Sequence, residues 1–322
     1  MNRTKAMTFC GTALALMLSM QAASAEELSL AGKVVGITTI RSDNQADRLF
    51  YQSAIAEAER LGAEVIALDA QSNDQTQVSQ IQTLIAQQPD AVIEILGNID
   101  VLNPWLERVK SAGIPLFTID TTTPHATNVV ASDNYAIGSA LALQMVADMN
   151  GKGNILVFNG FYSVPPCKIR YDQMKYVVSN FPDVKIIEPE LRDVIPNTAQ
   201  RAYSDTTDML TKMPNDGDIG SVWACWDVPL IGVTQAIDGA SRKGIRTYGV
   251  DGTADFMSMI EDPESAAGAV VIQDLVGMGK ASVQNVARHL AGEPVPPFTF
   301  VPHIMVTKAN AAEVIPTLPE TD

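Results

Sequence analysis

The sequence is poor in the residues that build metal and redox sites. It has 3 cysteines and 3 histidines among 322 residues, and His125, His289 and His303 stand far apart in the chain. A structural zinc site needs four ligands close together, so we expect no bound metal. The Gly-x-Ser-x-Gly elbow, the His-Glu-x-x-His motif and the dinucleotide-binding glycine fingerprint are also missing. These absences favour a protein that has no cofactor and is not an enzyme.

Basic residues are scarce as well. The chain carries 22 Lys and Arg against 37 Asp and Glu, a formal net charge of −15 at pH 7, and it has no Lys/Arg cluster. Such a chain is a poor partner for nucleic acid or for an anionic membrane surface. The length allows two domains of ordinary size.

The N-terminal 25 residues show the three-part pattern of a secretory signal peptide. Arg3 and Lys5 precede an uncharged apolar run over residues 7–20, and small residues follow up to Ala25. The run is shorter than the roughly 20 apolar residues that span a bilayer. We predict cleavage after Ala25 and export to the periplasm. An uncleaved membrane anchor is the alternative.

Short apolar runs alternate with helical patterns along the rest of the chain. Strands are expected at 33–40, 64–69, 91–96, 115–120, 154–158, 184–187, 220–225, 245–250 and 267–272. Helices are expected at 47–61, 76–87, 101–112, 135–149, 170–181, 198–213, 228–243, 257–261 and 277–290, with an extended tail at 298–306. This alternation predicts an α/β fold with two doubly wound parallel sheets, each covered by helices on both faces.

Polar residues gather in the loops that follow the predicted strands, where open parallel sheets bind their ligands. Carboxylates accept hydroxyl protons, amides and cations donate in return, and an indole face can cover the C–H side of a sugar. The set therefore favours a neutral polyhydroxylated ligand, although capping and turn roles are the alternative for any single residue. Its members are Asp43, Asn44, Asp47, Asn98, Asp120, Lys168, Arg170, Trp226, Asp227, Asp251 and Gln273.

The chain resembles the periplasmic sugar-binding proteins of ABC importers, in the ribose- and pentose-binding branch of the type I fold. The likeness rests on residues 40–62, 115–120, 130–134, 224–227 and 248–253, and it extends over nearly all of the mature chain. It implies two lobes joined by a hinge that the chain crosses three times. The N-terminal lobe would comprise residues 31–134 plus 274–301, and the C-terminal lobe residues 135–273 plus 302–322.

The resemblance also implies the function and the partners. A protein of this kind captures a small sugar or sugar alcohol between its lobes and delivers it, as a monomer, to the membrane permease of an ABC importer. A receptor for a signalling molecule or for chemotaxis is one alternative. A secreted carbohydrate-active enzyme is the other, with Asp120 and Asp251 as its paired carboxylates.

Position by position, part of the family's site is kept and part is changed. Asn44, Asp120, Asp251 and Gln273 match ligand-binding positions of the family. Ala46 and Asp47 stand where two aromatic residues enclose the sugar, and the other replacements are Thr121 and Lys168 for arginines, Trp226 for an asparagine and Asn197 for an aromatic residue. These changes favour a small sugar or sugar alcohol other than ribose.

Two cysteines, Cys167 and Cys225, remain after the predicted signal peptide. In an oxidising compartment an even pair favours a disulfide, and two small buried thiols are the alternative. Both cysteines are expected at strand ends, next to Lys168 and Trp226. A bridge would therefore fix two ligand-bearing loops and lower the cost of ordering them on binding.

Overall fold

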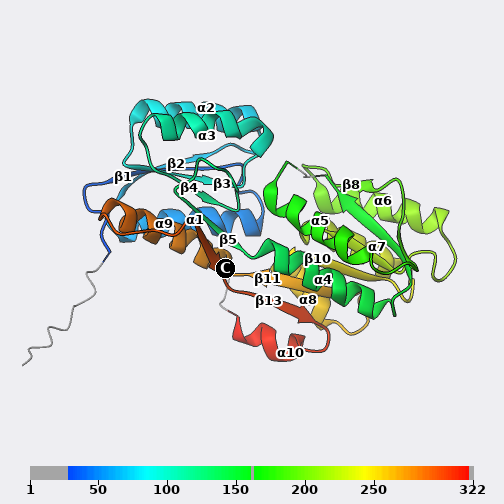
Figure 1. The fold of residues 1–322 in the computed structure, drawn as a ribbon. Coiled ribbons are helices and arrows are strands. Elements are labelled where there is room, and N and C mark those ends of the chain that lie inside the picture. The colour runs from blue at the N-terminus through cyan, green and yellow to red at the C-terminus, as the bar shows by residue number, and fades with distance from the viewer. Residues whose placement is uncertain (1–27, 161–162, 319–322) are drawn as a thin grey trace, which may run out of the picture.

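A computed structural model describes residues 28–160 and 163–318 of the chain. Two lobes lie side by side, each a twisted sheet with helices on both faces (Figure 1). The predicted signal peptide, residues 1–25, lies outside the described residues. Within the described part of the chain, no helix is both long and apolar enough to cross a membrane.

Lobe 1 is built on a six-stranded sheet in the order β12-β5-β4-β3-β1-β2, and all of its neighbouring strands are parallel. The strands are β1 (Val34–Thr39), β2 (Glu64–Asp69), β3 (Ala91–Ile95), β4 (Leu116–Ile119), β5 (Asn128–Ser132) and β12 (Phe298–Val301). The helices are α1 (Gln45–Arg60), α2 (Asp74–Gln87), α3 (Ile99–Ser111) and α9 (Leu275–Leu290). Helices α1 and α9 pack together on one face of the sheet, and α2 and α3 on the other (Figure 1).

Lobe 2 is built on a seven-stranded sheet in the order β13-β11-β10-β9-β6-β7, with β8 paired to β6. The strands are β6 (Gly153–Asn159), β7 (Val184–Ile186), β8 (Leu191–Arg192), β9 (Ser221–Ala224), β10 (Arg246–Asp251), β11 (Ala267–Gln273) and β13 (His303–Thr307). The helices are α4 (Asn134–Asp148), α5 (Pro165–Val178), α6 (Thr198–Lys212), α7 (Val228–Gly239), α8 (Ala254–Glu261) and α10 (Ala311–Val314), followed by a 3-10 turn at Ile315–Thr317.

The chain passes between the two sheets after β5, after β11 and after β12. Helix α4 packs against α5 of lobe 2, whereas α9 returns to lobe 1 and packs against α1. Strands β12 and β13 are separated by Pro302 alone, yet they belong to different sheets. Both lobes are therefore discontinuous in sequence, and each contains a strand from the C-terminal part of the chain.

The predicted α/β architecture is confirmed, with three local corrections. Strand β5 was not among the expected strands, and β13 is antiparallel to β11 in an otherwise parallel sheet. Helix α5 begins at Pro165, five residues before the predicted start at Arg170. A proline fits the first turn of a helix because the N–H that it lacks has no partner there. This early start places Lys168 on a helix and not in a strand-end loop.

Gly138 allows α4 and α5 to approach each other closely. A Cβ atom at Gly138 would lie 2.8 Å from both the Cα and the carbonyl oxygen of Arg170. Real Cβ atoms essentially never come so near to backbone atoms. The backbone that carries Arg170 can therefore hold its place only because residue 138 has no side chain.

We expect Gly138→Ala to lower the free energy of unfolding by about 1–3 kcal/mol, the usual cost of overpacking a filled interior. Urea denaturation measures it. Gly239→Ala is the matched control, since a Cβ there meets nothing within 4 Å, and alanine in a helix is up to about 1 kcal/mol better than glycine. Equal stability of the Gly138→Ala variant and the wild type would contradict the close-packing explanation.

Candidate functional site

A cavity of about 670 Å³ lies between the lobes. Its wall is built largely from residues that follow the carboxyl ends of strands in both sheets, the edge at which open parallel sheets bind ligands. Several of the sequence-predicted residues contribute to this wall: Asp47, Asn98 and Asp120 from lobe 1, and Arg170, Trp226, Asp251 and Gln273 from lobe 2.

Arg170, on α5, makes three side-chain hydrogen bonds in the interior between the lobes. Its Nε donates to Oδ1 of Asn134 over 2.7 Å, and its Nη2 donates to Oε1 of Gln273 over 3.0 Å. Its Nη1 donates to the carbonyl oxygen of Cys225 over 2.9 Å. The side chain is only 3% exposed. These bonds fix the planar guanidinium group in one orientation.

Two aspartates, one from each lobe, are attached to this arginine through amides. Nδ2 of Asn134 donates to Oδ1 of Asp120 over 3.1 Å, and Nε2 of Gln273 donates to Oδ1 of Asp251 over 2.7 Å. Nη1 of Arg170 also lies 3.7 Å from Oδ1 of Asp251. We call these five residues the Arg170 network. It joins lobe 1 to lobe 2 beneath the cavity.

The two aspartates are buried more deeply than ionised carboxylates usually are. Burial raises the pKa of Asp120, and the positive charge of Arg170 opposes that rise. Burial also raises the pKa of Asp251 well above its usual range, again against Arg170. The backbone φ is +54° at Asp120 and +114° at Asp251, a region that non-glycine residues rarely occupy and that is enriched at functional sites. Hydroxyl donors from a ligand would stabilise the charged form of both groups.

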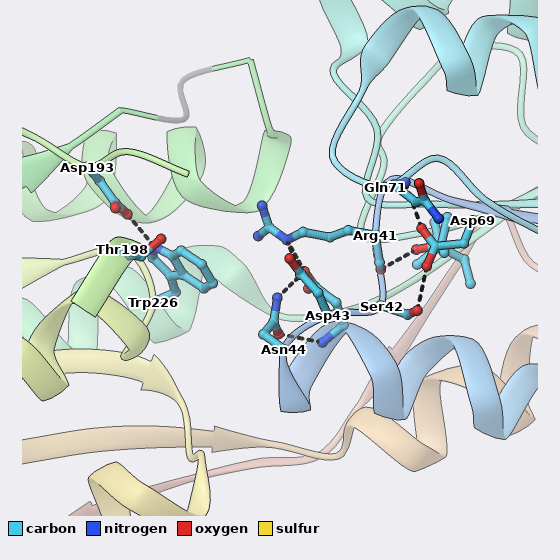
Figure 2. A network of polar contacts seen from close by, with 12 residues as sticks. Arg41, Ser42, Asp43, Asn44, Asp69, Gln71, Asp193, Thr198 and Trp226 are labelled. Atoms are coloured by element: carbon cyan, nitrogen blue, oxygen red, sulfur yellow. Dashed lines mark hydrogen bonds and ion pairs between the residues drawn. The ribbon is translucent and has the colours of Figure 1, made fainter. Parts of the chain in front are cut away.

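Arg41 and Trp226 meet across the cavity from opposite lobes. Arg41 follows β1, and its guanidinium carbon lies 4.9 Å from the centre of the Trp226 ring. Nε of Arg41 is paired with the carboxylate of Asp47, and the indole N–H of Trp226 donates to Asp193. Figure 2 shows the Arg41 side chain extending from lobe 1 toward this indole. Burial raises the pKa of Asp193 to about 6.

Five of the residues singled out in the sequence as ligand-binding candidates do not line the cavity. Asn44 caps α1, where its Oδ1 accepts a hydrogen bond from the backbone N–H of Asp47 over 3.0 Å. Thr121 is completely buried within lobe 1, where its Oγ1 accepts from the backbone N–H of Gly97 over 3.2 Å. Both side chains hold the loops that carry the site, and neither reaches its wall.

Asp227, Lys168 and Asn197 are the other three. Asp227 is buried, and its carboxylate accepts hydrogen bonds from the backbone N–H groups of Gly252 and Thr253. Lys168 is exposed on α5 and forms an ion pair with Asp172, one helical turn further on. Asn197 is exposed at the start of α6, with a left-handed φ of +66°. The preceding residues, Ile195 and Pro196, line the cavity instead.

The predicted disulfide between Cys167 and Cys225 is present. It ties the first turn of α5 to the end of β9. The residue before α5, Val164, makes no side-chain capping bond, so the bridge is a covalent attachment for the start of this helix. Arg170 lies three residues after one cysteine and Trp226 directly after the other, so the bridge fixes the backbone that carries both cavity side chains.

Sequence reasoning missed Arg41, Asn134 and Asp193. Arg41 stands in a predicted strand-end loop and could have been found as the one cation there. Asn134 is the first residue of α4 and was read as part of the motif at 130–134 without a role. Asp193 follows β8, a strand of two residues, which is too short to leave a periodic signal.

The fold and the cavity define a two-lobed solute-binding protein. Two lobes enclose a polar site, and no group of His, Cys, Asp and Glu among residues 28–160 and 163–318 could hold a metal ion. Comparison with known proteins gives the same class.

Residues 35–294 match the family model described as a periplasmic binding protein domain. A crystal structure of an ABC sugar transporter subunit from Rhodobacter sphaeroides is 68% identical, covering 88% of this chain and 100% of that one with a TM-score of 0.87. An ABC transporter solute-binding protein from Agrobacterium vitis with bound allitol is 48% identical, covering 90% and 100% with a TM-score of 0.88. The chain belongs to the periplasmic binding protein family, whose members bind solutes and are not enzymes.

One curated relative is similar over a shorter segment. The xylitol-binding protein of Mycolicibacterium smegmatis is 30% identical over 206 residues, which is 62% of this chain and 56% of that protein. The matched segment therefore spans little more than half the length of that relative.

Glu94, on β3, is a buried carboxyl group close to the loop that carries Asn98, and its titration predicts how stability depends on pH. Burial raises its pKa to about 8, against hydrogen bonds from Thr121, Gly97 and Gln77. Because an unfolded glutamate titrates near 4.3, the folded chain keeps a proton that the unfolded chain has lost. The free energy of unfolding should then fall by about 1.4 kcal/mol per pH unit between these two values.

Glu94→Gln removes this titration and keeps an acceptor for the neighbouring donors. We expect the variant to be more stable than the wild type at pH 8, with the difference shrinking toward pH 5. Urea midpoints at the two pH values measure it. A stability difference that does not change with pH would show that Glu94 is ionised in the folded protein.

The Cys167→Ser/Cys225→Ser double variant tests the disulfide. For a loop of 58 residues, the loss of the cross-link should lower the free energy of unfolding by about 2–4 kcal/mol. Urea denaturation with and without reductant measures it, and the double variant serves as the control because reductant should leave it unchanged. If reductant does not alter the midpoint of the wild type, the two thiols are not bridged in the folded protein.

Proposed function

We propose that this chain is the periplasmic solute-binding protein of an ABC importer and that it binds a sugar alcohol in the cavity between its lobes. The observation that carries the proposal is the Arg170 network, which presents one carboxylate from each lobe to the same buried space. A ligand with hydroxyl groups along its length can donate to Asp120 and Asp251 together, and this favours the closed arrangement of the lobes.

The charge of the cavity wall supports a neutral ligand. The wall contains three arginines and six aspartates: Arg41, Arg170 and Arg192, with Asp43, Asp47, Asp74, Asp120, Asp193 and Asp251. Even if burial keeps some of these aspartates protonated, the three arginines leave no surplus of positive charge for a sugar acid or a sugar phosphate. A polyol adds no charge, and each of its hydroxyls can both donate and accept hydrogen bonds.

Two of the relatives support a sugar alcohol, while others, such as the 30% identical ribose import binding protein of Bacillus subtilis, are named for ring sugars. The Agrobacterium vitis protein, 48% identical, was crystallised with allitol, and one curated relative is named for xylitol. Linear six- and five-carbon polyols are therefore the first ligands to test.

The export signal and the domain arrangement complete the proposal. Cleavage after Ala25 would release the mature chain into the periplasm as a monomer, which delivers its ligand to a membrane permease. The moving units would be residues 31–134 plus 274–301 and residues 135–273 plus 302–322. The separate sheets of lobes 1 and 2 support this division.

Isothermal titration of the mature chain, unfolded and refolded beforehand to remove carried-over ligand, tests the proposal. Allitol, other hexitols, pentitols and the matching aldoses are the ligands to compare. We expect a hexitol or pentitol to bind more tightly than any aldose. Tighter binding of an aldose would move the assignment to ring sugars. The absence of any binding heat with all of these polyols and aldoses would contradict a carbohydrate ligand.

Asp251→Asn should weaken the binding of that polyol by about 2–4 kcal/mol, because a buried ligand hydroxyl would lose its charged acceptor. Titration calorimetry gives the dissociation constant. Asp255→Asn is the matched control, since Asp255 is exposed on α8 and does not line the cavity. Equal affinities of the Asp251→Asn variant and the wild type would remove Asp251 from the site.

A further inference from the structure

We propose that Arg41 and Trp226 form a clasp that holds the lobes together across the cavity, so that Arg41 positions the lobes as well as lining the site. Arg41 belongs to lobe 1 and Trp226 to lobe 2. The ligand in the test below rests on the proposed function, but the clasp itself does not.

Each half of the clasp is held firmly within its own lobe. Arg41 is 14% exposed and is anchored by its ion pair with Asp47, whose carboxylate is 6% exposed. Trp226 is 7% exposed, and its N–H donates to Asp193. The two groups are therefore oriented before they meet, and little side-chain freedom remains to be lost when the lobes close.

The contact between the halves pairs a planar cation with an aromatic face. The Arg41 guanidinium carbon lies 4.9 Å from the centre of the indole ring, within the range of a cation–π interaction and at a site that excludes much of the water. The two residues stand on different lobes, so an outward rotation of the lobes would separate them. The energy of the pair therefore counts only in the closed arrangement and shifts the open–closed balance toward it.

Two neutral hydrogen bonds also join the lobes. The backbone N–H of Ala254 donates to the side chain of Gln45 over 2.9 Å, and the N–H of Ile99 donates to the carbonyl of Ser163 over 3.0 Å. Water can satisfy these amide donors and acceptors when the lobes part. The Arg41–Trp226 contact brings together a charge and an aromatic face, and water replaces that contact less well.

A double-mutant cycle tests the clasp in the ligand-free mature protein. The four proteins are the wild type, Arg41→Gln, Trp226→Leu and the double variant, and the readout is the melting temperature. Loss of the indole leaves Asp193 without that donor, and the carboxylate of Asp193 also attracts Arg41. Asp193→Asn is therefore introduced into all four proteins, so that this attraction stays out of the cycle. We expect the double variant to melt higher than the sum of the single shifts predicts.

Arg48→Gln, combined with Trp226→Leu in a second cycle, is the matched control. Arg48 lies on the same helix as Asp47 but outside the cavity wall, so its cycle should be additive. Additive shifts in the Arg41 cycle would overturn the clasp, whatever any ligand does.

Allitol binding gives a second readout. Arg41→Lys keeps the charge next to Asp47 but lacks the planar guanidinium, and we expect it to raise the allitol dissociation constant roughly three- to thirtyfold. The change should lie mainly in a faster dissociation rate, because the pair forms after the lobes close. A dissociation constant within twofold of the wild type would overturn the clasp. Failure of the wild type itself to bind allitol would count against the proposed ligand, and the ligand-free cycle would still decide the clasp.

Discussion

One buried positive charge determines how the strand-end loops are arranged in this molecule. Arg170 is almost completely removed from water, and a buried ion is tolerated only when its hydrogen bonds are satisfied. Its partners come from the end of β9, the end of β11 and the start of α4. Removing one partner of such a buried group typically costs about 3–5 kcal/mol. The need to satisfy Arg170 therefore holds these three segments together at the cavity.

The same charge makes the binding chemistry possible. Asp120 and Asp251 would both tend to become protonated in this interior, and Arg170 opposes that tendency. Asn134 and Gln273 link Arg170 to the two carboxylates. Each amide accepts a hydrogen bond from the arginine and donates one to an aspartate. Because this path runs from one lobe to the other, the geometry of the hinge and the position of the two cavity-lining carboxylates are physically coupled.

The sequence was sufficient for the fold, and it also named several residues that line the cavity between the lobes. Alternating apolar runs located nearly every strand, and the strand-end rule placed Asp120, Asp251 and Gln273 in the cavity wall. It failed where tertiary contacts override local pattern. Helix α5 begins at Pro165, which places Lys168 on the surface. Strand β8 has only two residues, so no pattern in the sequence indicated Asp193. Thr121 does not line the cavity for a different reason. The backbone turns at Asp120, so the next side chain is buried in lobe 1, away from the cavity.

The two lobes hold the side chains of the cavity wall in unequal ways. In lobe 2 the disulfide holds α5 against β9, and buried Asp227 accepts hydrogen bonds from the backbone N–H groups of Gly252 and Thr253, directly after Asp251. Arg170, Trp226 and Asp251 are therefore positioned without help from lobe 1. Asp120, in contrast, finds its amide partner in Asn134, at the start of α4 in lobe 2. The position of this lobe 1 carboxylate therefore depends on the other lobe, whereas the lobe 2 side chains of the wall are held within their own lobe.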